Sequence, residues 1–151
     1  MISAADIFCL AVTAGLMFLE AHRGIIPALI TFIGILVGLV ATRIAYVPLS
    51  EQMRPSDAYM LLMLVTILLI ALVSVIVTRR LKINVTEVEA AIGALLGLGT
   101  GLLFSYALFE WLSIRYGAGT PLVKSSLLYW AISESAGLRE IGDFFRKLTG
   151  R

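Results

Sequence analysis

The chain has 151 residues, of which 60% are hydrophobic and 15% are charged, and its mean hydropathy is +0.98. In soluble domains about a quarter of the residues are charged, so this composition excludes an ordinary soluble protein and indicates an integral membrane protein. The formal net charge of +2 is small and the basic residues are scattered, which argues against a nucleic-acid partner.

Four apolar segments, separated by short groups of charged residues, predict an all-α polytopic membrane protein. They cover residues 4–19, 24–42, 58–77 and 90–109. A helix needs about 20 apolar residues to cross the hydrocarbon core, and only the first segment is clearly short of this length. Tilting of that helix or local thinning of the bilayer would accommodate it. We therefore expect a four-helix transmembrane bundle in residues 1–112 and a C-terminal interfacial, amphipathic helical tail in residues 113–151.

The first segment begins with a helix-capping pattern. Ser3 stands three residues before Asp6, so the hydroxyl can cap the helix while the carboxylate suits its positive N-terminus. The alternative is that Asp6 is an intramembrane carboxylate on an ion path. Cys9, the single cysteine, excludes an intramolecular disulfide and is expected to be a small core residue. A signal peptide is not expected, because the first residues carry Asp6 and no Lys or Arg.

Residues 20–24 (EAHRG) form a turn so short that the first two helices must be antiparallel neighbours. Gly24 permits the sharp reversal. His22 is the only histidine, and without Cys or His companions it is a poor metal ligand. Glu20 offers it an ordinary partner at the membrane interface. We therefore expect no metal site and no cofactor.

The second segment combines a proline in its first turn with the motif Gly34-x-x-x-Gly38. It is expected to end at Tyr46 and Pro48, with the Arg43 side chain snorkelling to the interface. The third segment, residues 58–77, is rich in Leu, Val and Ile all round, so it faces either lipid or the core of the bundle.

The fourth segment carries a stripe of small residues, formed by Gly93, Gly97 and Gly101. Lipid provides no hydrophobic reason for helices to associate, so close backbone approach over small residues holds them together. We expect this stripe to pack against the small face of the second helix. Thr86 and Glu89 form a capping box at its start. Alternatively, Glu89 and Thr100 on the same face would form a polar functional site.

The region after the fourth segment changes in character. Glu110 and Trp111 form an interfacial pair, and Thr120 is expected to cap a further helix that runs through Ser135. An amphipathic pattern follows at 138–148, too short to span, which suits the bilayer surface or a partner. Its apolar side consists of Leu138, Ile141, Phe144, Phe145 and Leu148. Lysines and arginines near the helix ends are balanced between the two sides, so the orientation stays open.

The order of these features resembles the bacterial colicin V production protein family. The residues that carry the resemblance are Asp6, Arg23-Gly24, Glu89 before the three spaced glycines, and Ser125-Ser126-Leu127-Leu128. The resemblance implies a multi-pass protein of the bacterial inner membrane, linked to toxin export, envelope homeostasis or transport. It adds Arg23 to the candidate polar functional residues, which are Asp6, Arg23, Glu89 and Thr100. The candidate helix-packing residues are Gly34, Gly38, Gly93, Gly97 and Gly101.

Three classes of function were weighed against these features. An enzyme needs a convergent nucleophile, base and orienting group, or a metal cluster, and the sequence contains neither pattern, so no catalytic residue is expected. A small homo-oligomeric channel or transporter component is the alternative. We favour a scaffold or accessory subunit, whose partners are the lipid bilayer and either other membrane subunits or further copies of this chain.

Overall fold

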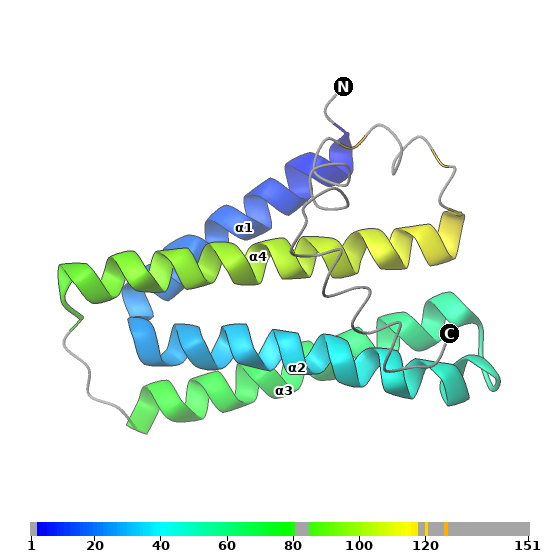
Figure 1. Ribbon diagram of the computed structural model, residues 1–151, viewed down its shortest axis with the longest axis horizontal. Helices are drawn as coiled ribbons and strands as arrows, with labels where there is room; N and C mark the ends of the chain where they lie inside the picture. Colours follow the sequence, from blue (N-terminus) through cyan, green and yellow to red (C-terminus); the bar gives the residue numbers. More distant parts are fainter. Residues whose placement is uncertain (1–2, 81–84, 118–119, 121–125, 127–151) are drawn as a thin grey trace.

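The computed structural model describes residues 3–80, 85–117, 120 and 126. These residues contain four α-helices and no strand, which confirms the all-α prediction (Figure 1). The helices are α1 (Ala4–Arg23), α2 (Ile25–Ser50), α3 (Pro55–Arg80) and α4 (Glu87–Tyr116). All four are long and apolar enough to cross a membrane. The helix expected from Thr120 to Ser135 and the amphipathic pattern at 138–148 lie outside the described residues.

The helices run in alternate directions and form two packed pairs. α1 crosses α4 obliquely and packs against it, while α2 pairs with α3 (Figure 1). α2 also packs on α4 and so joins the two pairs, whereas α1 and α3 make little direct contact. The start of α1 and the end of α4 therefore lie towards the same end of the bundle (Figure 1).

Each helix extends beyond the apolar segment that predicted it. α1 continues to Arg23, so Gly24 alone separates it from α2, with a φ of 84° that favours glycine. α2 continues to Ser50 and includes Pro48, so the prediction that the helix closes at this proline is wrong. Pro48 has no N–H to donate to the carbonyl oxygen of Ile44, so the last turn of α2 continues without that bond. Hydropathy thus identified the membrane core of each helix rather than its ends.

Two capping boxes fix the starts of α1 and α4, as predicted. The Ser3 hydroxyl accepts from the Asp6 amide at 3.2 Å, and the Asp6 carboxylate accepts from the Ser3 amide at 2.9 Å. In α4 the Thr86 hydroxyl accepts from the Glu89 amide at 3.4 Å, and the Glu89 carboxylate accepts from the Thr86 amide at 2.9 Å. Each box satisfies two backbone donors that the helix itself leaves without a partner.

We expect Thr86→Ala to lower the free energy of unfolding by about 1 kcal/mol, because the Glu89 amide loses its acceptor. Thr86→Ser keeps the hydroxyl and should match the wild type. Thermal unfolding in detergent, followed by circular dichroism, measures both variants. Equal stability of Thr86→Ala and the wild type would contradict the capping role.

Three glycines of α4, Gly93, Gly97 and Gly101, pack against α1, and each of them approaches its backbone closely. A Cβ atom built on Gly93 would lie 2.5 Å from the carbonyl oxygen of Glu20, and one on Gly97 would lie 2.7 Å from that of Leu16. A Cβ on Gly101 would lie 2.7 Å from the Cα of Thr13. No side chain fits at these three positions unless the two helices move apart.

The glycines of α2 meet α3 instead, so the expected pairing of the small faces of the second and fourth helices is wrong. A Cβ on Gly38 would lie 2.0 Å from the Cγ2 of Thr66, and one on Gly34 would lie 3.0 Å from the Cγ1 of Ile70. Side chains of α3 thus fill the hollows over Gly34 and Gly38. The pairing cannot be read from the sequence, because a small-residue face accepts either a bare backbone or a projecting side chain.

Candidate functional site

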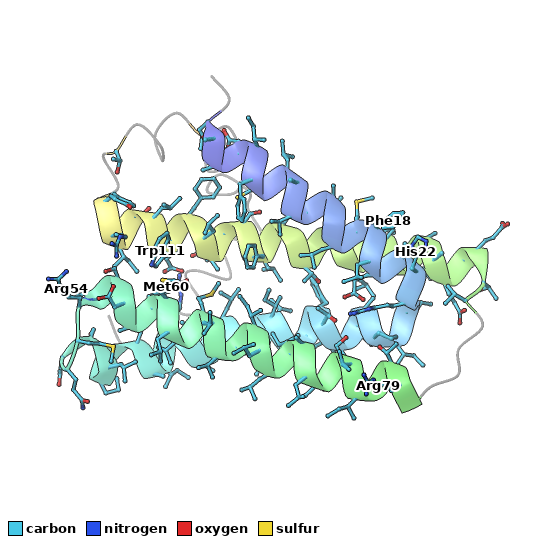
Figure 2. All side chains as sticks on the ribbon, turned by 180° about the vertical axis from the view of Figure 1, so that it is seen from behind. Phe18, His22, Arg54, Met60, Arg79 and Trp111 are labelled. Atoms are coloured by element: carbon cyan, nitrogen blue, oxygen red, sulfur yellow. The ribbon has the colours of Figure 1, made fainter. Side chains whose placement is uncertain are left out.

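A cavity of about 280 Å³ lies where the four helices meet. α1 and α3 form its opposite walls, and α2 and α4 form its floor with residues that include Ile35 and Phe104. Figure 2 shows α4 between α1 and α3, with α2 crossing behind α3. Since α1 and α3 make little direct contact, the cavity is a partly open groove between them. We call it the α1–α3 groove.

The groove is aliphatic along most of its length and polar towards one end. Its apolar walls include Val12 and Leu16 of α1 and Ile67 and Ile70 of α3. The polar groups are the side chains of Glu20, Arg23, Thr31, Ser74 and Thr100. This composition, an apolar body with a few polar groups, is typical of small-molecule sites in proteins.

Glu20 is the most unusual residue of the groove, because it is a carboxylate buried without a partner. Glu20 is 1% exposed, and neither of its carboxylate oxygens has a hydrogen-bond partner among the described residues. It lies one turn before the end of α1, inside the bundle rather than at its rim. An isolated ionised carboxylate in such surroundings is costly, so burial of this kind calls for a cation or a proton.

The expected pairing of Glu20 with His22 is wrong. The Nδ1 atom of His22 donates to the carbonyl oxygen of Phe18 at 2.9 Å, and the centroids of the two rings lie 4.3 Å apart. Figure 2 labels both residues on α1. His22 is exposed, whereas Glu20 points into the bundle. Residues two apart on a helix face different directions, which explains the separation.

Arg23 lies three residues after Glu20 and so shares its face of α1. Its Nη1 atom donates to the hydroxyl of Ser74 on α3, at 3.3 Å, and no hydrogen bond joins it to Glu20. The guanidinium therefore reaches across the end of the groove from α1 to α3. The polar end thus combines an anionic group, a cationic group and a hydroxyl.

The groove brings together only some of the residues that the sequence singled out. Arg23 and Thr100 line it, together with Glu20, which was not among the candidates. Glu89 belongs to the capping box of α4 and stands roughly 16 Å along the helix from Thr100, so the expected Glu89–Thr100 pair does not form. The Thr100 hydroxyl instead donates to the Leu96 carbonyl oxygen at 2.9 Å.

Asp6 is buried at the start of α1 and has partners besides the helix amide. It is 2% exposed, and the hydroxyl of Ser126 donates to its Oδ1 atom. Residue 126 is thereby joined to the start of the first helix. Asp6 and Ser126 are both among the residues that carry the family resemblance.

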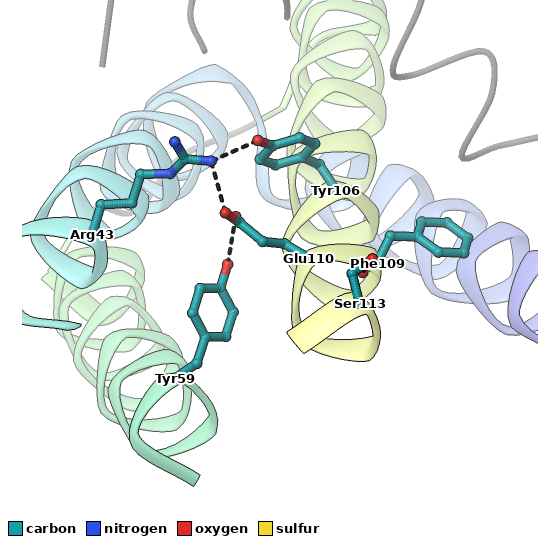
Figure 3. A network of polar contacts seen from close by, with 6 residues as sticks. All are labelled: Arg43, Tyr59, Tyr106, Phe109, Glu110 and Ser113. Atoms are coloured by element: carbon teal, nitrogen blue, oxygen red, sulfur yellow. Dashed lines mark hydrogen bonds and ion pairs between the residues drawn. The ribbon is translucent and has the colours of Figure 1, made fainter. Parts of the chain in front are cut away.

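A second polar cluster lies at the other end of the bundle and joins three helices (Figure 3). Arg43 of α2 donates to Tyr106 at 2.7 Å and to Glu110 at 2.8 Å, both on α4. Tyr59 of α3 donates to the other carboxylate oxygen of Glu110 at 2.9 Å. We call these four residues the α2–α3–α4 clamp. Its polar groups are mutually satisfied, which favours a structural role.

The clamp corrects one expectation. Arg43 does not snorkel away from the bundle, because its guanidinium is engaged by α4 and its side chain is only 29% exposed. Glu110 faces the bundle, while its neighbour Trp111 donates from Nε1 to the Ser56 carbonyl oxygen at 3.1 Å. The two residues thus make separate contacts from α4, to the clamp and to the start of α3, and their place at the membrane interface stays a prediction.

Comparison with protein-family models, with curated proteins and with solved structures gave no match to this chain. The resemblance to the colicin V production family stays a prediction. Among the described residues there is also no group of three or more side chains that could hold a metal ion. Its four long apolar helices make the chain a multi-pass α-helical membrane protein.

Proposed function

We propose that this chain is a binding subunit of a transport or envelope-maintenance assembly in the bacterial inner membrane, and that it acts without catalysis. The α1–α3 groove with its buried, unpartnered Glu20 carries the proposal. A volume of about 280 Å³ is close to the smallest of ordinary ligand sites, which begin near 300 Å³. The groove thus suits one small amphiphilic molecule.

The chemistry of the groove favours binding over catalysis. A serine nucleophile needs a neighbouring base, and the Ser74 hydroxyl accepts a hydrogen bond from a guanidinium instead. The only histidine of the chain is turned towards Phe18 on the outer side of α1. Glu20 therefore has no companion in the groove with which to share an acid–base task.

The same lining favours one of the two non-catalytic classes that the sequence leaves open. An ion channel needs carbonyl or charged groups to replace the hydration shell of the ion along its path. The walls of the groove are mostly aliphatic and offer no such path. This supports an accessory or binding subunit over a homo-oligomeric channel. The contact between Asp6 and Ser126 adds support for the colicin V production type, and with it for the inner membrane.

Filling the groove tests the proposal. Ala71 lines it from α3, and the next residue, Leu72, is 58% exposed on the outside of the same helix. We expect Ala71→Trp to lower retention of a bound amphiphile at least tenfold, and Leu72→Trp to leave it unchanged. Native mass spectrometry of the full chain, released from its own membrane in nanodiscs, measures bound small molecules and associated polypeptides together.

Two results would contradict the proposal. One is a wild-type particle that carries neither an amphiphile nor another polypeptide. The other is a bound amphiphile that Ala71→Trp and Leu72→Trp retain equally, which would place its site outside the groove.

A further inference from the structure

The buried carboxylate of Glu20 defines what kind of molecule the groove accepts. We propose that the groove is a site for an alkylammonium group, with the ammonium against Glu20 and the aliphatic chain between α1 and α3. This inference rests on the proposed binding function and names the chemical class of the ligand. Two independent observations carry it, the cavity itself and the unpartnered carboxylate that lines it.

The neighbours of Glu20 leave it short of hydrogen-bond donors. The guanidinium of Arg23 donates to Ser74, the hydroxyl of Thr31 donates to the Pro27 carbonyl oxygen at 2.9 Å, and Thr100 likewise bonds its own helix. A carboxylate only accepts hydrogen bonds, and a primary ammonium offers three donors on one positive charge. An ammonium ion therefore supplies the hydrogen-bond donors that the Glu20 carboxylate lacks, together with a positive charge beside that of Arg23, whose guanidinium is directed to Ser74.

Other ligand classes fit the groove less well. An anion would be repelled by Glu20, and a neutral apolar molecule would leave the carboxylate buried and unpaired. A hard metal cation prefers six or more oxygen ligands, whereas Glu20 is the only carboxylate among the described residues that line the groove. A bound alkylammonium would keep its charge at Glu20 and place its chain on aliphatic side chains.

The apolar part of the groove sets the shape of the rest of the ligand. From the level of Glu20 to that of Val12 on α1 the distance is roughly 12 Å, at about 1.5 Å per residue. Leu16 stands between these two levels, and Ile67 and Ile70 line the opposite wall. A single unbranched chain of medium length matches this space.

The test uses the full chain in nanodiscs made of phosphatidylglycerol, which has no ammonium group. Isothermal titration with the decylammonium ion measures affinity, and decanol reports binding by the aliphatic walls alone. We expect Glu20→Gln to weaken decylammonium binding tenfold or more, as loss of a charge-assisted contact predicts. Glu89→Gln, at the same end of the bundle but in a cap, should change it less than twofold.

The decanol measurement and the groove-filling variant Ala71→Trp serve as controls that Glu20→Gln is still folded. Glu20→Gln removes a charge that has no partner, so decanol binding should persist in this variant, whereas Ala71→Trp should abolish binding of both probes. If decylammonium binds Glu20→Gln as tightly as the wild type while Ala71→Trp still blocks it, the alkylammonium assignment is wrong but the binding function stands. If neither probe binds the wild type, both proposals fail.

An alkylammonium can come from a lipid headgroup or from a free amphiphile, and a second arm separates these sources. A minor share of phosphatidylethanolamine is added to the nanodiscs, and native mass spectrometry records whether the wild type retains it. If the wild type retains phosphatidylethanolamine and Glu20→Gln does not, the result supports the site, with a lipid as the source of the alkylammonium group. Retention of decylammonium alone supports the site with a free amphiphile as its source. Equal retention by both proteins would overturn recognition through Glu20.

Discussion

Replacing Gly97 with leucine is expected to drive α1 and α4 apart and to destabilise the bundle strongly. A Cβ at this position would lie 2.7 Å from the carbonyl oxygen of Leu16 and 2.9 Å from the Cα of Met17. Both are backbone atoms, which cannot rotate out of the way. Overpacking of a core usually costs about 1–3 kcal/mol, and a clash with backbone belongs at or above the upper end of this range.

Two other glycines provide matched controls for Gly97→Leu. A Cβ on Gly15 of α1 would have no atom within 4 Å, so Gly15→Leu should be neutral or slightly stabilising. Gly34→Ala should have a smaller effect than Gly97→Leu, because its nearest neighbour is a side-chain atom, the Cγ1 of Ile70 at 3.0 Å, which needs to shift by only a few tenths of an ångström. Unfolding by sodium dodecyl sulfate in mixed micelles ranks the variants. Equal losses for Gly15→Leu and Gly97→Leu would show that α1 does not pack on α4 through this stripe.

Glu110→Ala is expected to lower the free energy of unfolding by about 2 kcal/mol, because two bonds to the carboxylate are lost together. Arg43 would lose its ion pair with Glu110 while its bond to Tyr106 remains, and Tyr59 would lose its acceptor. Fully buried pairs cost about 3–5 kcal/mol when broken, but the Arg43 and Glu110 side chains are 29% and 26% exposed. The same micellar unfolding measurement applies to this variant.

A surface ion pair and a double variant serve as controls for the predicted effect of Glu110→Ala. Asp57 lies 3.5 Å from Arg115 and both side chains are largely exposed, so Asp57→Ala should cost less than about 1 kcal/mol. The double variant Arg43→Ala with Glu110→Ala should cost less than the sum of the single changes, because the two side chains share one interaction. Strictly additive losses would mean that Arg43 and Glu110 are not coupled.

The helices themselves could be predicted because their cause is local. A run of about 20 apolar residues between charged groups is sufficient for a spanning helix, and capping residues are read over three positions. The packing partners of each face could not be predicted in this way. The stripe of Gly93, Gly97 and Gly101 is compatible with several neighbours, and only the assembled bundle pairs it with α1 and leaves the glycines of α2 to α3.

The groove shows the same division between local and long-range information. The sequence indicates Arg23 and Thr100 as candidates, but it predicts an interfacial position for Glu20, which stands at the end of an apolar segment. Its burial depends on α1 meeting α4 at the level of Gly93, which brings this turn inside the bundle. Likewise, Arg43 and Glu110 are 67 residues apart, and nothing local to either one indicates that they meet.

The alternating course of the four helices has a consequence for how a ligand is oriented. An even number of crossings returns the chain to its starting side, so Ser3 and Tyr116 face the same aqueous compartment. Glu20 and Arg23 lie at the opposite end of α1. An amphiphile held in the groove would thus belong to the leaflet that lies away from Ser3 and Tyr116. Its headgroup would enter and leave on that side, and any partner that binds near Ser126 would act on it from across the bilayer.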